Sequence, residues 1–317
     1  MDTHSRVGFI GLGTMGLPMA TNLARAGVAV VAHDASAAAR EAAGRLPGVT
    51  IADSPRAVAA QSAVVFSCLP NDDIVRAVYL GPDGVAAGAS AGLITCDCST
   101  VSPEATLEVH RGLAGRGVAH LDTPMLGSQP QAVSGEIFFI VGGDGALLPR
   151  VQPYLEIMGR LHLYVGPSST GNRIKLIHNG LAAVVSAAVA EALATAVRAG
   201  VDGATLYEVV CKGGGMAFGT YWDRRAARVL EGEFAPTFML QHMLKDATLA
   251  LAHARAAGVP TPLLAETRET YAEAMDQGLG TQDFSAVSRV IEKRVGAPLF
   301  GRPASPTANP TGGRPAS

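Results

Sequence analysis

The sequence predicts an α/β domain on a mostly parallel, doubly wound sheet, followed by an all-helical domain. Short apolar runs alternate with helical stretches through the first half. A proline-free helical stretch then covers 171–199, and only helical patterns follow it. We expect a sheet domain at 1–166, a helical domain at 167–295 that begins with a long interdomain helix, and a disordered tail at 296–317.

The first half contains runs of apolar residues with the length of strands. Two of the intervening helices have clear start signals, because Ser54-Pro55 and Ser102-Pro103 each place a capping hydroxyl before a proline at the first helical position. Alternating strands and helices indicate a parallel sheet that is covered on both faces. The expected strands are 7–10, 28–32, 49–52, 63–68, 93–97, 118–122, 137–141 and 161–165.

The second half reads as helical throughout. The stretch 171–199 predicts one helix of about eight turns, which Gly200 ends. Its alanine- and valine-rich middle is apolar on most faces, so we expect it to be buried between domains or subunits. The last 22 residues hold five prolines and four glycines and are not expected to order themselves. Further helices are expected at 204–211, 221–230, 239–258 and 261–277.

Composition excludes several classes of protein. The chain of 317 residues is 48% hydrophobic and 16% charged, which is typical of globular domains, and its net charge of −2 provides no basic field for nucleic acid or an anionic membrane. The first six residues carry no apolar signal region, and we expect that no apolar run approaches a membrane span, so a cytoplasmic protein is expected. Cys96 and Cys98 form a C-x-C pair, but buried thiols are favoured over a metal site because no second ligand pair has suitable spacing.

A glycine-rich loop follows the first predicted strand. It has the pattern G-x-G-x-x-G and opens a helix that runs to Gly27. The first glycine permits a tight turn, the second lets the backbone approach a pyrophosphate, and the third lets helix and strand pack closely. The helix N-terminus adds free N–H groups. The sequence therefore predicts a Rossmann-type dinucleotide site formed by Gly11, Leu12, Gly13, Thr14, Met15 and Gly16.

Asp34 ends the second strand, 18 residues after Gly16. A carboxylate at this place accepts hydrogen bonds from both ribose hydroxyls of NAD, and it repels the 2′-phosphate of NADP. Ala35 follows, where an arginine would suit NADP. Arg40 on the next helix could reach such a phosphate, although a solvated arginine is the favoured interpretation. NAD is thus the expected cofactor, with NADP as the less favoured alternative.

Lys175 and Asn179 lie four residues apart near the start of the long helix and therefore share one face. A lysine that is buried there, next to a positively charged nicotinamide, would have its pKa lowered into the range of a general acid or base. Asn179 can donate to and accept from one substrate oxygen. From these two residues alone, an ordinary exposed lysine and asparagine is the favoured interpretation.

Four motifs in order resemble the β-hydroxyacid dehydrogenase family, which includes 3-hydroxyisobutyrate dehydrogenases and tartronate semialdehyde reductases. They are the loop from Gly11 to Leu23, the segment Asp122–Ser128 (similar to D-A-P-V-S-G-G), the segment Gly166–Asn179 (similar to G-x-x-G-x-G-x-x-x-K-x-x-x-N), and Lys245-Asp246 (similar to a K-D-L segment). The resemblance covers 7–295 and implies a helical domain like that of 6-phosphogluconate dehydrogenases.

The resemblance implies roles at the substrate side. Lys175 would be the catalytic lysine, and Asn179 would orient the substrate. Gly127 and Ser128 would present N–H groups to a substrate carboxylate, with Leu126 beside them.

Further roles are implied at the cofactor side. Leu69 and Pro70 would line the nicotinamide ribose together with Thr100, which would also lie next to the substrate. Lys245 would reach toward cofactor and substrate. Independently of the family, the loop after the fourth strand and the strand end at Ser99-Thr100 are expected at the carboxyl edge of the sheet, where ligands bind.

Two positions depart from the family pattern. Ser169 stands where the family usually has glycine, so this turn is expected to differ in detail. Leu126 replaces a serine and removes a hydroxyl that would help to hold a carboxylate. Lys175 is retained, which argues against the related imine reductases.

The resemblance implies an oxidoreductase that interconverts a small 3-hydroxycarboxylate and its semialdehyde with NAD, without a metal. One alternative is a glyoxylate or succinic semialdehyde reductase that uses NADPH. An alternative of another class is a catalytically silent NAD-binding protein. A homodimer or homotetramer is expected because the helix at 171–199 has more apolar surface than one small domain covers, and similar enzymes pair through this region. No nucleic acid or membrane partner is expected.

Overall fold

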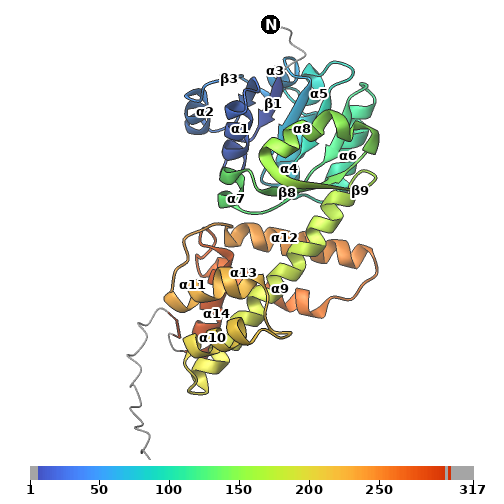
Figure 1. Cartoon of the computed structure of the whole chain (residues 1–317). Helices are drawn as coiled ribbons and strands as arrows, with labels where there is room; N and C mark the ends of the chain where they lie inside the picture. The colour runs from blue at the N-terminus through green and yellow to red at the C-terminus, as the bar shows by residue number, and fades with distance from the viewer. Residues whose placement is uncertain (1–5, 297–298, 301–317) are drawn as a thin grey trace, which may run out of the picture. The chain divides into compact units, whose positions relative to one another are not determined.

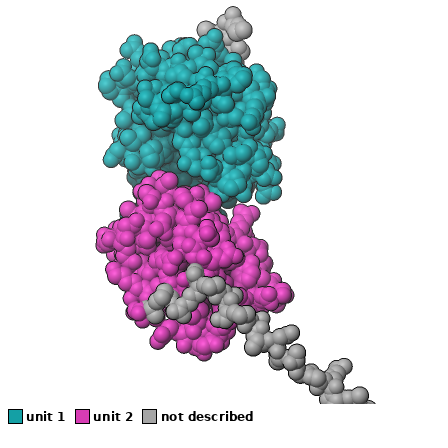
Figure 2. Space-filling model, turned by 90° about the vertical axis from the view of Figure 1, so that its left-hand side faces the viewer, with its two compact units in different colours: residues 1–181, 245–261 teal, residues 182–244, 262–317 magenta. Residues whose placement is uncertain are grey.

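A computed structural model describes residues 6–296 and 299–300. The chain divides into two compact units, which Figure 2 shows in separate colours. The first unit comprises Met1–Leu181 and Lys245–Thr261, and the second comprises Ala182–Leu244 and Pro262–Ser317. This division differs from the expected boundary at 166/167, because it falls within the long helix and returns part of a later helix to the first unit.

Within the described residues, nine strands form one sheet with the order β3-β2-β1-β4-β5-β6-β8-β7, and β9 pairs with β8. The strands β1 to β6 pair in parallel, whereas β8 runs antiparallel to β6 and β7. All eight expected strands are confirmed, and only the two-residue β7 escaped prediction because it is too short to show periodicity. The bounds are β1 Val7–Ile10, β2 Val30–His33, β3 Val49–Ile51, β4 Val64–Ser67, β5 Ile94–Asp97, β6 Ala119–Asp122, β7 Met125–Leu126, β8 Ile137–Gly142 and β9 Gly159–Gly166.

Successive residues of the central strands pack on opposite faces of this sheet. In β1, Phe9 belongs to an apolar cluster with α1, α2, α7 and α8, whereas Ile10 belongs to a second cluster with α3 to α6. Helices therefore cover both faces, as Figure 1 shows, and the doubly wound prediction is confirmed. The helices are α1 Gly16–Arg25, α2 Ala37–Gly44, α3 Pro55–Ala59, α4 Asp72–Leu80, α5 Val85–Gly88, α6 Pro103–Ala114, α7 Gln129–Ser134 and α8 Leu148–Met158, with a 3₁₀ turn at Gly145–Leu147.

The predicted helix caps are present. The hydroxyl of Ser54 accepts a hydrogen bond from the N–H of Ala57, and that of Ser102 from the N–H of Ala105, both at 3.1 Å. These bonds satisfy N–H groups that the first turn of a helix leaves without a partner. The α3 and α6 helices thus start where the sequence predicted.

The long helix α9 spans Thr170–Arg198, as expected. By length and by its mean hydropathy of 1.9 it could cross a membrane, so the expectation that no stretch approaches a membrane span is wrong for this segment. Half of the most apolar window is buried within the protein. Core helices of soluble proteins pass the same test, and α9 fits that description.

The second unit is helical. It contains α10 Gly203–Gly213, a π-helical turn at Trp222–Ala226 that continues into α11 Ala227–Glu231, and α13 Pro262–Asp276. The helix α12, Leu240–Ala256, begins in this unit. These helices match the four expected ones. A 3₁₀ turn at Phe284–Val287 and α14, Ser288–Val295, were not predicted; α14 is amphipathic but only eight residues long.

The expected disordered tail needs a correction at two residues. Leu299 and Phe300 are only 8% and 4% exposed and belong to an apolar cluster with Trp222 and Val229. Their N–H groups donate to Oε1 of Glu292 at 2.6 and 2.8 Å. Two large apolar side chains therefore anchor this stretch despite the prolines around it. The rest of the predicted tail, 297–298 and 301–317, lies outside the described residues.

Candidate active site

The glycine loop connects β1 to α1. A Cβ atom at Gly11, which has a φ of 92°, would lie 2.2 Å from the carbonyl oxygen of Cys68, and one at Gly16 would lie 1.9 Å from that of Gly11. Both positions therefore exclude side chains. No atom lies within 4 Å of a Cβ built at Gly13. The space in front of this middle glycine is open, as a site that admits a phosphate close to the backbone requires.

Asp34 lies at the end of β2 and holds this loop. Its Oδ2 accepts a hydrogen bond from the N–H of Leu12 at 2.6 Å, and its Oδ1 accepts one from the N–H of Ser36 at 2.7 Å. Each carboxylate oxygen retains a lone pair for a ribose hydroxyl. The guanidinium of Arg40 donates to the carbonyl oxygens of Asp34 and Ala35 at 2.7 and 3.0 Å. Arg40 is thus engaged by the backbone next to Asp34 rather than only by solvent.

The carboxyl ends of β4 and β5 are joined by a buried carboxylate. Oδ1 of Asp97 accepts hydrogen bonds from the hydroxyls of Ser67 at 2.7 Å and Ser99 at 2.5 Å. The Ser99 hydroxyl oxygen in turn accepts the N–H of Leu69 at 2.8 Å. Burial raises the pKa of Asp97 despite these bonds. This chain of contacts fixes the Leu69-Pro70 turn relative to β5, and the sequence analysis did not find Asp97.

A second carboxylate at the sheet edge holds the start of α9. Oδ1 of Asp122 accepts the N–H of Ser169 at 2.8 Å, and Oδ2 accepts the N–H of Asn172 at 3.0 Å. Ser169 has a φ of 75°, the left-handed region that favours glycine, and among the described residues it is the only non-glycine residue with a positive φ. The turn therefore keeps the geometry that a glycine would give, with a serine under strain. Asp122 thus links the predicted substrate loop to the helix that carries Lys175.

Lys175 is 9% exposed. Burial disfavours its charged form and is the main reason that its pKa falls to about 8; Asp246 opposes this shift, and the charge of Lys245 adds to it. At this pKa both the neutral and the charged amine are well populated near neutral pH. The side chain can therefore accept or return a proton.

Asn179, Lys245 and Thr100 are brought together by a residue that the sequence analysis did not select, Asp246. Its Oδ2 accepts the amide N–H of Asn179 at 2.6 Å, and its Oδ1 pairs with Nζ of Lys245 at 3.0 Å. Nζ of Lys245 also donates to the carbonyl oxygen of Thr100 at 2.5 Å. The available signal was the acid directly after Lys245, but its contact with Asn179 spans 67 residues.

A partly exposed histidine completes this group of contacts. Nδ1 of His178 lies 3.0 Å from Oδ1 of Asn179. Burial and Lys175 lower the pKa of His178, and its hydrogen bond to Asn179 opposes them. Both ends of the Asn179 amide are therefore engaged, one by His178 and one by Asp246.

The predicted substrate loop ends at Ser128. Both its N–H and its hydroxyl donate to Oε1 of Gln131, at 2.9 and 2.8 Å. These bonds form the capping box of α7, and the role of Ser128 toward a substrate stays a prediction. Leu126 pairs with Phe138 across the β7–β8 ladder, and Gly127 is exposed.

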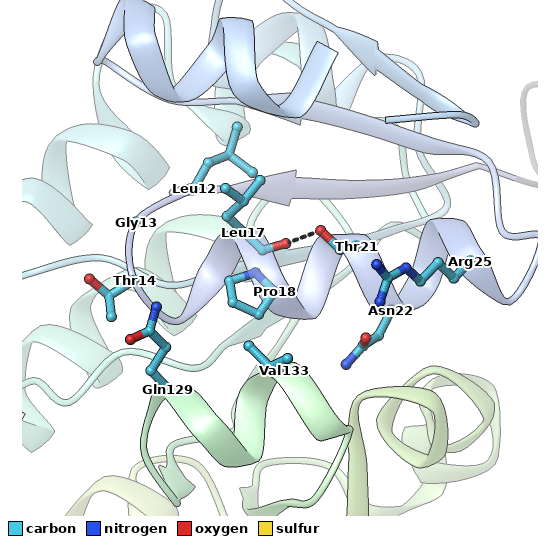
Figure 3. A pocket seen from close by; sticks show the side chains of 10 residues that line it. All are labelled: Leu12, Gly13, Thr14, Leu17, Pro18, Thr21, Asn22, Arg25, Gln129 and Val133. Atoms are coloured by element: carbon cyan, nitrogen blue, oxygen red, sulfur yellow. Dashed lines mark hydrogen bonds between the residues drawn. The ribbon is translucent and has the colours of Figure 1, made fainter. Parts of the chain in front are cut away.

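One cavity, of about 500 Å³, lies beside the glycine loop between α1 and α7. Figure 3 shows Thr14 and Gln129 near the loop and Arg25 further along α1. Its lining includes Leu12, Gly13 and Thr14 of the glycine loop but none of Asp34, Lys175 and Asn179. Among the described residues, no group of three or more His, Cys, Asp or Glu could hold a metal ion, and all four cysteines are free.

Two family models match the chain. The model described as the NAD binding domain of 6-phosphogluconate dehydrogenase matches residues 6–166. The model described as NAD-binding of NADP-dependent 3-hydroxyisobutyrate dehydrogenase matches residues 169–291. Together they cover nearly the whole described chain.

Named relatives are similar over their full lengths. The chain is 34% identical to 2-(hydroxymethyl)glutarate dehydrogenase of Eubacterium barkeri, covering 95% of this chain and 99% of the relative. It is also 34% identical to NAD-dependent L-serine dehydrogenase of Pseudomonas aeruginosa, covering 92% and 99%. The solved structure of Mycobacterium tuberculosis 3-hydroxyisobutyrate dehydrogenase with L-serine has a TM-score of 0.82 at 30% identity, covering 91% of this chain and 99% of that chain.

Proposed function

Because this chain belongs to the β-hydroxyacid dehydrogenase family, we propose that it interconverts a small 3-hydroxycarboxylate and its semialdehyde with NAD, using Lys175 as general acid and base. The family consists of dehydrogenases and reductases that act on the CH–OH group of small hydroxy acids and semialdehydes. The observation that carries the proposal is the buried Lys175, with its pKa near 8, next to the Asn179–Asp246–Lys245 group.

In the oxidative direction, neutral Lys175 accepts the proton of the substrate hydroxyl at Nζ while the carbinol carbon loses its hydride. Bound NAD supplies the hydride acceptor. In the reductive direction, charged Lys175 returns the proton to the developing alkoxide. Both directions need an amine that titrates near the working pH, and the burial of Lys175 provides it.

Asn179 orients the substrate oxygen toward Lys175 in this proposal. Its amide is held by Asp246, whose other oxygen pairs with Lys245. Lys245 contacts the backbone at Thr100, next to the turn that would line the nicotinamide ribose. These contacts support one orientation of the amide and reduce its freedom before the substrate binds.

NAD is proposed as the cofactor because Asp34 is fixed with lone pairs available for ribose hydroxyls and would repel a 2′-phosphate. The glycine loop of Gly11, Gly13 and Gly16 would hold the pyrophosphate, with main-chain N–H groups from Thr14 and Met15, whereas the N–H of Leu12 is engaged by Asp34. NADP remains the alternative, since Arg40 lies next to Asp34.

A panel assay tests the proposal. The purified protein is assayed with 3-hydroxyisobutyrate, L-serine, 2-(hydroxymethyl)glutarate, succinic semialdehyde and glyoxylate, each with NAD(H) and NADP(H). We expect the best kcat/KM for a carboxylate-bearing hydroxy acid with NAD. Preference for glyoxylate or succinic semialdehyde with NADPH would support the reductase alternative. NADH binding without any turnover would support a catalytically silent protein.

A homodimer or homotetramer is also proposed. On α9, Ile177 and Leu181 are 63% and 65% exposed, and Ile174 continues this apolar stripe by one turn. We propose that a second copy of this chain covers the stripe. We further propose that the protein is cytoplasmic and binds neither nucleic acid nor membrane. Light scattering at micromolar concentration tests the oligomer, and a monomer alone would contradict it.

A further inference from the structure

The peptide group that joins Thr100 to Val101 is held at both of its polar atoms. Its carbonyl oxygen, on Thr100, accepts a hydrogen bond from Nζ of Lys245 at 2.5 Å. Its N–H, on Val101, donates to Oδ1 of Asn172 at 3.3 Å. Two bonds on opposite ends of one peptide group restrict its rotation. The segment that follows β5 is therefore tied to the first turn of α9, which carries Asn172.

The side-chain amide of Asn172 has one orientation that satisfies its neighbours. The N–H of Val101 can only donate, so it must meet the amide oxygen. The amide nitrogen donates to Oγ1 of Thr106 at 3.1 Å, and this hydroxyl donates onward to the carbonyl oxygen of Ser102 at 3.3 Å. Asn172 is fully buried, so these bonds do not compete with solvent. The amide thus joins α9 to the segment 101–102 and to the start of α6.

Asn172 lies on the same stripe of α9 as the proposed catalytic pair. Lys175 and Asn179 follow it by three and seven residues, a spacing that places all three side chains on one side of the helix. They are 0%, 9% and 5% exposed. Lys175 is one turn from Asn172, and the lysine side chain has no printed hydrogen bond of its own to the loop at Thr100. The place of this helix turn therefore depends on the bonds of Asn172.

We propose that Asn172 is a positioning residue, which ties the helix turn before Lys175 to the Thr100–Val101 peptide and so aligns the amine with the substrate hydroxyl. This inference rests on the proposed function. Alignment matters because a displacement of about 1 Å at a reacting group can cost roughly 100-fold in rate. When the Asn172 amide is removed, the peptide keeps its bond to Lys245, and the helix turn gains freedom.

The test measures kcat, KM and NADH affinity with the best substrate of the panel. We expect kcat to fall roughly 10- to 100-fold in Asn172→Ala. It should fall about 3- to 10-fold in Thr106→Val, which removes one neutral hydrogen-bond partner of the amide. KM and NADH affinity should stay within about twofold. Thr106→Ser keeps the hydroxyl and should restore kcat. The matched control is Thr95→Val, which removes an equally buried hydroxyl bonded to Ala119 and His120 and should leave kcat within about twofold.

A double-mutant cycle with Lys175→Ala separates positioning from a structural role. Because Asn172 acts through Lys175, Asn172→Ala should change kcat by less than about twofold once Lys175 is alanine. An equal loss in both backgrounds would overturn the proposal, and so would an unchanged kcat in the single variant. If Asn172→Ala does not fold, the same cycle with Thr106→Val decides.

The failure of this inference can be told from the failure of the proposed function. Near-normal turnover in Lys175→Ala alone would refute the proposed general base, and the inference would fall with it. Impaired turnover in Lys175→Ala together with normal turnover in Asn172→Ala would refute the positioning role of Asn172 and leave the proposed function intact.

Discussion

The cofactor side and the substrate side of the first unit follow from the sequence to very different degrees. At the cofactor side, the loop Gly11–Gly16 and Asp34 lie within 24 residues of one another and use backbone N–H groups. At the substrate side, the amide of Asn179 meets Asp246 across 67 residues, and Nζ of Lys245 meets Thr100 across 145 residues. A site that binds its ligand through backbone N–H groups is determined by the local conformation of the chain. Contacts between side chains depend on how distant elements pack together. The cofactor side could therefore be predicted from the local sequence, whereas the contacts at the substrate side required the structure.

The strongest test of the substrate side is Lys175→Ala. We expect kcat to fall by roughly 10²–10⁴, the usual contribution of general acid–base catalysis, because Lys175 is the proposed acceptor of the hydroxyl proton. NADH affinity, measured by fluorescence titration, should remain nearly unchanged. This result would separate the two sides functionally. Near-normal turnover by a folded variant would remove Lys175 from the mechanism.

The cofactor side is tested by combining Asp34→Ser with Ala35→Arg. Each charge-assisted hydrogen bond lost or gained is worth about 1.5–3 kcal/mol, so the ratio of kcat/KM for NAD and NADP should shift by at least about 10-fold toward NADP. Total activity should also fall, because Asp34 anchors the N–H of Leu12. Ala35→Arg alone is the control and should shift the ratio less. A preference of the unmodified enzyme for NADP would show that Asp34 is misinterpreted.

The pH profile also distinguishes the two sides, because in this proposal the group that titrates near neutral pH is Lys175, at the substrate side. Oxidation requires neutral Lys175, so kcat/KM should rise about tenfold per pH unit below pH 8 and level off above it. Reduction requires the charged form and should fall above about pH 8. NADH affinity should change little over this range. The measurement is kcat/KM against pH in both directions, in buffers of constant ionic strength. Oxidation that slows, or reduction that speeds up, as the pH rises would contradict the proposal.

The smallest expected effect concerns the turn that joins the two sides. Ser169→Gly should raise the free energy of unfolding by about 1 kcal/mol, because glycine adopts a φ of 75° without strain. The serine hydroxyl is also buried without a hydrogen-bond partner. Thermal unfolding should show a melting temperature higher by roughly 2–4 °C. Ser169→Ala removes only the hydroxyl and should give a smaller gain; an equal gain would mean that backbone strain contributes nothing.

Sequence patterns predicted most of the fold because its elements are regular. The eight strands, the caps at Ser54 and Ser102 and the helix α9 all followed from periodicity and local signals. The two-residue β7 is too short to show periodicity, and the eight-residue α14 was missed although it is amphipathic. Leu299 was assigned to a tail because its neighbours are prolines and glycines, although its own side chain is buried. Composition averages over a segment, whereas burial is decided residue by residue.

In the site, the sequence identified the groups but not what holds them. Lys175, Asn179 and Lys245 were selected, and the structure connects them through Asp246. Asp97 and Asp122 escaped notice as anchors because a carboxylate at a strand end has no local signature of its partners. The contact between Ser128 and Gln131 follows the capping-box spacing S-x-x-Q, a local signal that the sequence analysis did not use.

The first unit is built from two separate segments of the chain, and this affects the order in which the protein can fold during synthesis. Lys245 and Asp246 belong to this unit, yet they leave the ribosome only after Ala182–Leu244 has been made. A nascent chain that ends before them already contains the glycine loop, Asp34 and Lys175. It lacks the carboxylate that holds the Asn179 amide. A dinucleotide pocket can therefore form on the growing polypeptide before the catalytic cluster is complete.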